Sequence, residues 1–195
     1  MGVIKTALEI ALEKTGNVKV DKAIINQYEA KQKGIKTANA FLSGGIDDIS
    51  EELKKTPSQD RDSVKQGIFD VLVSQIVLPE SNESAAKMER IGKGLSFVIK
   101  SNEFQAMYKQ ILQMFSRYIE ESAHYEKMIE QQYAPKLRQK EEELSRRMGR
   151  EVHIDPLQDP EYINFYNQHM SALKGNYEPF AEQAREEAKR IFAGK

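Results

Sequence analysis

The sequence predicts an all-α protein, and two observations support this. Apolar residues recur at spacings of three and four along the chain, whereas alternation of apolar and polar residues at a period of two is almost absent. Glycine and proline residues stand where the apolar stripes end, as expected of helix boundaries. We expect one elongated helical domain over residues 1–195, a bundle that contains a long antiparallel, coiled-coil-like helical hairpin.

An N-terminal helical arm is predicted over residues 1–57, and its first helix covers residues 2–14. Val3, Ile4, Ala7, Leu8, Ala11 and Leu12 form the apolar stripe of this helix. Glu9 and Glu13 lie elsewhere on its surface, so the segment is amphipathic. The Gly16-Asn17 pair ends it.

Two further helices complete the arm. One runs from about residue 20 to 43 and ends at the Gly44-Gly45 pair, because glycine readily adopts the left-handed conformation common after a helix. Its predicted apolar stripe consists of Ile24, Tyr28, Ile35, Ala38 and Leu42. The other covers residues 48–55 and ends before Pro57, since the residue that precedes a proline disfavours the α conformation.

A buried pair of helices is predicted over residues 58–101. The first member covers residues 58–78 and is apolar nearly all round in its second half, which is typical of a helix in the protein interior. We expect Pro79 to end it.

The second member of the pair extends to about Lys100. Either Ser81 or Asn82 is suited to cap its start, because both side chains accept hydrogen bonds from free backbone N–H groups. Gly92 and Gly94 within it indicate a close approach by another helix.

The helical hairpin is predicted over residues 102–193, and its first arm is an uninterrupted helix to about Met148. Its seven-residue apolar repeat consists of Phe104, Tyr108, Ile111, Phe115, Tyr118, Tyr125 and Ile129. Ser122 is the weak position of this repeat. We expect Pro135 to kink the helix, because proline removes one backbone hydrogen bond and crowds the preceding turn.

The second arm of the hairpin starts at Pro160, with Asp159 as its cap. Its stripe consists of Tyr162, Tyr166, His169, Leu173, Tyr177, Phe180, Ala184, Ala188 and Ile191. Two apolar stripes joined by a short connection predict antiparallel packing. Pro179 lies within this arm, so both arms are expected to kink.

Composition excludes several classes of function. The absence of cysteine rules out disulfides, thiolate metal sites and cysteine nucleophiles. A formal net charge of -1 lacks the basic excess typical of nucleic-acid binders. The first residues lack an uninterrupted apolar run, and no run approaches the length of a membrane span. We expect a cytoplasmic protein with no bound nucleic acid and no membrane span.

Glu121 and His124 form the sharpest candidate for catalysis. A carboxylate and an imidazole three residues apart share one helix face, as in di-iron four-helix bundles. Such a centre needs a second copy of the motif, but His169 is preceded at that spacing by Tyr166. An ordinary polar histidine beside the coiled-coil seam is the preferred interpretation, and no catalytic, cofactor-binding or metal-binding residue is assigned.

The connection over residues 149–158 is one candidate contact surface beside the N-terminal arm, because connecting loops often carry recognition. His153 and Asp155 within it have the chemistry of a base and its orienting group, but turn formation explains them better. The basic residues near the connection are Lys136, Arg138, Lys140, Arg146, Arg147 and Arg150. Glutamates alternate with them, and spacings such as Glu142 to Arg146 and Glu143 to Arg147 predict a solvated, self-neutralised face.

Three stretches together resemble an uncharacterised family of bacterial helical proteins. They are Gly2 to Thr15, Tyr133 to Leu137, and the Asp155-Pro156 pair with Asp159 to Tyr162. The resemblance implies a bacterial cytoplasmic protein and carries no activity and no functional residues.

The function expected from the sequence is therefore a non-enzymatic one. We predict a helical structural or adaptor protein that binds a protein partner or itself, without a cofactor, through the hairpin or the N-terminal arm. The alternative is a metal-dependent helical-bundle enzyme that uses Glu121 and His124.

Overall fold

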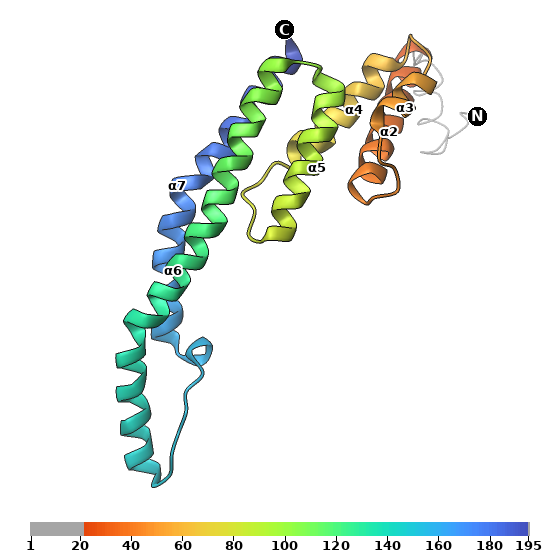
Figure 1. Cartoon of the computed structure of the whole chain (residues 1–195). Helices are drawn as coiled ribbons and strands as arrows, with labels where there is room; N and C mark the ends of the chain where they lie inside the picture. The colour runs from red at the N-terminus through yellow and green to blue at the C-terminus, as the bar shows by residue number, and fades with distance from the viewer. Residues whose placement is uncertain (1–21, 195) are drawn as a thin grey trace, which may run out of the picture. The chain divides into compact units, whose positions relative to one another are not determined.

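The structure is a computed structural model that describes residues 22–194. Its helices are α2 (Lys22–Leu42), α3 (Ile49–Lys55), α4 (Arg61–Ser74), α5 (Asn82–Ile99), α6 (Asn102–Met148), the 3-10 turn Pro156–Gln158 and α7 (Pro160–Ala193). The described residues contain helices and no strands, so the predicted all-α class is confirmed (Figure 1). The predicted helix over residues 2–14 lies outside them. The chain divides into two compact units between Val71 and Leu72, and each is described by itself.

In the first unit, α2 and α4 approach each other through two glycines. A Cβ atom on Gly34 would overlap the carbonyl oxygen of Val64, and a Cβ atom on Gly67 would overlap the carbonyl oxygen of Lys31. Glycine is therefore needed on both helices, because the two backbones are in direct contact. The contact also fixes which face of α2 is turned toward α4.

The buried face of α2 differs from the predicted one. Small residues and one aromatic residue form it: Ala30, Gly34, Thr37, Ala38 and Phe41. Of the predicted stripe, only Ala38 is buried, whereas Ile24 and Tyr28 are exposed. The prediction was wrong because it weighed side-chain hydrophobicity, while the packing is set by the glycine contact.

The short helix α3 follows the prediction closely. Asp48 caps it by accepting a hydrogen bond of 2.7 Å from the backbone N–H of Ser50. Ile49 and Leu53, four residues apart on one face, are buried. The helix ends at Lys55, immediately before Thr56 and Pro57.

In contrast, α4 ends four residues earlier than predicted, at Ser74 rather than Leu78. Ile76 is fully buried, and its carbonyl oxygen accepts a hydrogen bond of 2.8 Å from the guanidinium group of Arg185 on α7. The apolar run continues as a non-helical segment in which Ile76 and Leu78 are buried and Val77 is exposed, and α7 bonds the Ile76 carbonyl. A short apolar run alone does not distinguish these two cases.

The start of α5 confirms the predicted cap. Ser81 accepts from the backbone N–H of Ser84, and the Ser84 hydroxyl accepts from the N–H of Ser81, which is a capping box. Gly92 lies against the ring of Tyr108 on α6, and a Cβ atom there would overlap that ring. The Tyr108 hydroxyl donates to the carbonyl oxygen of Met88 at 2.9 Å, so this glycine admits the side chain that joins α5 to α6.

The second unit is built on the packing of α6 against α7, which run side by side in Figure 1. The contacting pairs follow opposite chain directions: Glu103 with Arg190, Tyr118 with Tyr177, and Tyr133 with Tyr162. Ser101 caps α6 and Asp159 caps α7. Pro135 lies within α6 and Pro179 within α7.

We predict that Gly67→Ala destabilises the first unit by about 2 kcal/mol, because the new methyl group forces the α2 and α4 backbones apart. Chemical denaturation followed by circular dichroism measures the change in the free energy of unfolding. Gly175→Ala is the matched control, since open space surrounds Gly175 on α7. The control should gain about 0.5–1 kcal/mol from its higher helix propensity. A neutral Gly67→Ala would contradict the close crossing.

Candidate protein-binding surface

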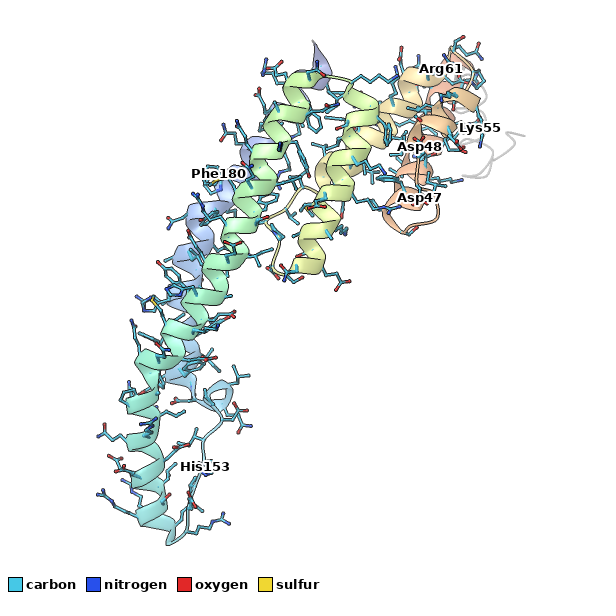
Figure 2. The ribbon with its side chains drawn as sticks, viewed as in Figure 1. Asp47, Asp48, Lys55, Arg61, His153 and Phe180 are labelled. Carbon is cyan, nitrogen blue, oxygen red and sulfur yellow. The ribbon has the colours of Figure 1, made fainter. Side chains whose placement is uncertain are left out.

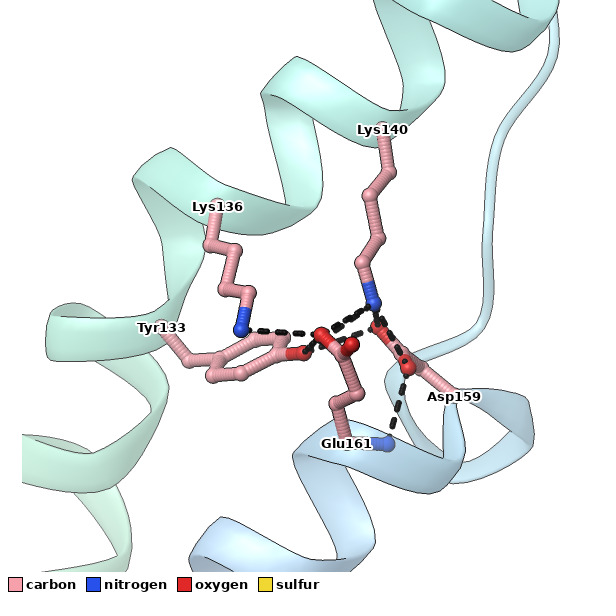
Figure 3. Close-up of polar contacts among 5 residues, drawn as sticks. All are labelled: Tyr133, Lys136, Lys140, Asp159 and Glu161. Carbon is pink, nitrogen blue, oxygen red and sulfur yellow. Dashed lines mark hydrogen bonds and ion pairs between the residues drawn. The ribbon is translucent and has the colours of Figure 1, made fainter.

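A polar cluster joins α6 to the start of α7, and we call it the closing cluster: Tyr133, Lys136, Lys140, Asp159 and Glu161 (Figure 3). At its centre is the Asp159 carboxylate, which is 5% exposed. It accepts hydrogen bonds from the Tyr133 hydroxyl at 3.0 Å and from the Lys140 ammonium group at 2.7 and 2.9 Å. It also accepts from the backbone N–H of Glu161 at 3.0 Å, and so caps α7.

Two further ion pairs surround this centre. The Glu161 carboxylate lies 2.8 Å from the ammonium group of Lys136 and 2.9 Å from that of Lys140. Hydrogen bonds from these two lysines lower the pKa of Glu161 to about 2, and the hydrogen bond from Lys140 lowers the pKa of Asp159. The pKa of Lys140 is raised by the same contacts, with Asp159 as the largest cause. All three groups therefore stay charged across the physiological pH range.

Beside these charges lies an aromatic cluster that packs the two helices together. Ile129, Tyr133 and Tyr162 are its buried members, and Leu137, Phe165, Tyr166 and Met170 pack against them. The rings of Tyr133 and Tyr162 meet edge to face, with their centroids 5.2 Å apart. The charged side chains of the closing cluster thus lie at one edge of the aromatic contact between α6 and α7.

The connection over residues 149–158 lies along the last turns of α6 rather than projecting from them. The backbone N–H of Val152 donates to the Ser145 hydroxyl, and that of Ile154 donates to the Glu141 carboxylate, both at 2.9 Å. His153 is largely exposed (Figure 2), and its ring nitrogens lie 3.6 Å from the Glu141 carboxylate of α6 and 3.5 Å from the Glu151 carboxylate. Leu144 and Met148 are also exposed, and we call this pair the tip surface.

A groove runs between α6 and α7 near their other ends, and we call it the methionine groove. Its volume is about 450 Å³, and it is lined by Met107, Gln110, Ile111, Gln113, Met114, Arg117, Phe180, Gln183, Ala184 and Glu187. Ile111 and Ala184 are buried and form the floor, while Met107, Met114 and Phe180 are half-buried walls. Phe180 is labelled on α7 in Figure 2.

Within the second unit, all of the residues that line this groove belong to α6 and α7. Other parts of the same helices are covered. Tyr108 of α6 joins α5, and Arg185 of α7 joins the segment after α4. The groove is therefore an apolar face of the helix pair that remains open in the second unit.

A second, more polar groove contains Ser122, the weak position of the predicted repeat. It has a volume of about 500 Å³ and lies between α6, α7 and the Pro79–Asn82 segment. The Ser122 hydroxyl is buried, and no hydrogen-bonding partner lies within its reach in the described part of the chain. Glu126 and Tyr166, joined by a hydrogen bond of 2.8 Å, also line this groove.

The structure does not gather the residues considered for catalysis into one site. His124 is exposed, and Glu121 is half-buried, where its carboxylate contributes with burial to a raised pKa of Tyr177. His169 contacts the ring of Phe165, with the centroids 4.5 Å apart. Within residues 22–194 no three side chains of histidine, aspartate or glutamate are grouped so that they would hold a metal ion.

Only some of the basic residues near the connection form ion pairs with glutamates of the same helix. The predicted pair of Glu142 and Arg146 is present at 3.5 Å. Between Glu143 and Arg147, however, the described residues show no ion pair. Sequence reasoning missed that Lys136 and Lys140 reach across to α7, because their partners are 19 to 25 positions away along the chain.

Most of the chain matches a known protein family. Residues 50–190 match a family of unknown function, DUF6657. The chain belongs to this family. No curated protein and no solved structure matches it. The matched region of DUF6657 includes the closing cluster and both grooves, and it confirms the predicted resemblance to an uncharacterised family.

Among the helices within residues 22–194, none combines the length and the hydrophobicity of a membrane span.

We predict that Asp159→Asn lowers the free energy of unfolding by about 2 kcal/mol at pH 7, because Lys140 and Tyr133 lose a charged acceptor. The pKa of Asp159 is lowered in the folded state, so its contribution is complete above the ordinary value of 3.8 and disappears as the pH falls below it. The stability difference between the two proteins should therefore shrink from pH 4 to pH 2. Denaturant titration at each pH measures it.

The matched control for this substitution is Asp155→Asn. Asp155 is an exposed cap of the 3-10 turn, and it accepts from the backbone N–H of Leu157 at 3.0 Å. Its change in stability should stay below about 0.5 kcal/mol at every pH. A constant difference between wild type and Asp159→Asn down to pH 2 would show that the charge of Asp159 does not stabilise the fold.

Proposed function

We propose that this protein is a non-enzymatic adaptor that binds another protein by taking an amphipathic helix of that protein into the methionine groove. The single observation that carries the proposal is an open apolar groove between two long helices. Helix-in-groove binding is a common way for helical proteins to recognise partners, because the guest helix buries its apolar stripe against the groove.

The lining of the groove suits such a guest. Methionine side chains are flexible and polarisable, so Met107 and Met114 adapt to the shape of an inserted side chain. The exposed rim residues Gln110, Gln113 and Gln183 are uncharged and offer hydrogen bonds to polar positions of the guest helix.

Charge at the ends of the groove favours one kind of guest. Glu187 is already bound by the guanidinium group of Arg190. Arg117 forms no ion pair with any residue of the described chain. The guest helix is therefore expected to place an acidic residue beside Arg117, which gains a charge-assisted hydrogen bond when the site is closed to water.

The test starts by isolating a partner with the tagged protein and producing that partner in pure form. We predict that the double variant Met107→Gln and Met114→Gln binds it at least tenfold more weakly than wild type, because the apolar walls become polar while their volume is nearly kept. Isothermal titration calorimetry measures the Kd. Circular dichroism and thermal unfolding establish that the variant keeps its fold.

The tip surface supplies the matched control, Leu144→Gln with Met148→Gln, which changes two exposed apolar residues of the same helix. This variant should bind the partner like wild type. Full binding by the groove variant, or loss of binding by the tip variant, would contradict the proposed groove. Recovery of the tagged protein alone would argue against an adaptor.

A further inference from the structure

Ser122 interrupts the apolar repeat of α6 and leaves a polar group inside the protein. Phe115 and Ile129, seven residues before and after it, are buried. The Ser122 hydroxyl oxygen is buried as well, yet no partner for a hydrogen bond lies near it among residues 22–194. A buried polar group without a partner destabilises a fold, so its presence at a core position indicates a role other than packing.

The groove that Ser122 lines also contains an unpaired carboxylate. We call it the Ser122 groove; it lies between α6, α7 and the segment before α5, with a volume of about 500 Å³. The Glu126 carboxylate accepts a hydrogen bond of 2.8 Å from the Tyr166 hydroxyl, but it forms no ion pair with any described residue. Lys174, in contrast, lies 3.6 Å from Glu80. Among the described residues that line the groove, the charge without an opposite partner is therefore negative.

Tyrosine rings and apolar side chains line the same groove. Tyr118 is buried and Tyr166 is half-buried. Burial, together with the hydrogen bond to Glu126, raises the pKa of Tyr166 to about 12, so its hydroxyl stays protonated and continues to donate to the carboxylate. The face of a tyrosine ring attracts a cation, and Ile119 and Met170 offer apolar contact to an attached chain.

We propose that the Ser122 groove binds an alkylammonium ion, which is the protonated form of an aliphatic amine. The ammonium group pairs with the Glu126 carboxylate and donates to the Ser122 hydroxyl, which then has the hydrogen bond that it lacks. Rotation about one bond turns this hydroxyl toward the ligand, because serine has three staggered rotamers. A carboxylate ligand is disfavoured, since Lys174 is already paired. The groove shares no lining residue with the methionine groove.

The test titrates the full-length protein with n-hexylammonium chloride and follows the backbone amide chemical shifts by NMR. Saturable shifts should occur at Ser122, Glu126 and Tyr166, with a Kd of about 1 mM for a ligand of this size. 1-Hexanol and hexanoate are the matched ligands, since they carry the same chain without the positive charge. Both should bind at least about fivefold more weakly. Equal binding of the three ligands, or shifts confined to the methionine groove, would overturn the proposal.

Glu126→Gln removes the unpaired charge from the groove and keeps the size of the side chain. This variant should bind hexylammonium at least about fivefold more weakly than wild type, because the ammonium group loses its counter-ion. Glu130→Gln is the matched control, since Glu130 is an exposed glutamate one turn further along α6 and does not line the groove. The control should bind like wild type. Equal effects of the two substitutions would contradict a site at Glu126.

Ser122→Ala separates ligand binding from packing. It should weaken hexylammonium binding at least about threefold, because the ammonium group loses an acceptor. Ser116→Ala is the control, an exposed serine of α6 whose hydroxyl donates to the carbonyl oxygen of Leu112, and it should bind like wild type. Without ligand, the Tm of Ser122→Ala should exceed that of the control by about 2 °C, because only Ser122 loses an unpartnered hydroxyl. A lower Tm, or unchanged binding, would overturn the proposal.

Two sources supply alkylammonium groups, namely free amines and the lysine side chains of peptides. Titration with a lysine blocked at both its amino and carboxyl ends distinguishes them. Tighter binding of the blocked lysine than of hexylammonium would assign the groove to a peptide ligand. Weaker binding of the blocked lysine would assign it to a free amine.

Discussion

The packing of α6 against α7 depends at one end on the carboxylate of Asp159. This single group caps α7, accepts the hydroxyl hydrogen of Tyr133 and binds the ammonium group of Lys140. Each contact alone is modest, but together they satisfy a nearly buried charge from three directions. Because Tyr133 also packs on Tyr162, the polar and apolar contacts of the two helices share one residue.

The helix pair also has an open groove, which lies away from Asp159. The closing cluster and the aromatic cluster join the helices beside Pro135, and the ion pair of Glu103 with Arg190 joins their other ends. Between these points the pair keeps an uncovered apolar face, lined by Met107, Met114 and Phe180. A protein that binds a helix needs such a combination of a fixed frame and an adaptable lining.

Some of this structure follows from the sequence, because it is local. The serine and aspartate caps of α5 and α7, and the position of Pro160, are signals within one turn of the chain. The buried face of α2 could not be predicted from the sequence, since Gly34 and Gly67 act through backbone contact rather than hydrophobicity. The end of α4 did not follow either, because the backbone of Ile76 is satisfied by Arg185, which lies far along the chain.

The candidate groove could not be predicted from the sequence either. Met107 and Met114 repeat at seven residues but lie beside the main stripe of α6, so the periodicity gives them no special place. Only the packing of α7 turns them into the walls of a groove. The link between Lys140 and Asp159 was missed for a similar reason, because it depends on how the connection over residues 149–158 folds back along α6.

The antiparallel register of α6 and α7 can be tested by measuring distances between spin labels. One nitroxide pair is placed at positions 103 and 190, and the other at positions 103 and 167, by cysteine substitution in a chain that has no native cysteine. We expect a narrow, short distance for the first pair and one longer by roughly 30 Å for the second. A reversed order, or two broad distributions, would contradict it.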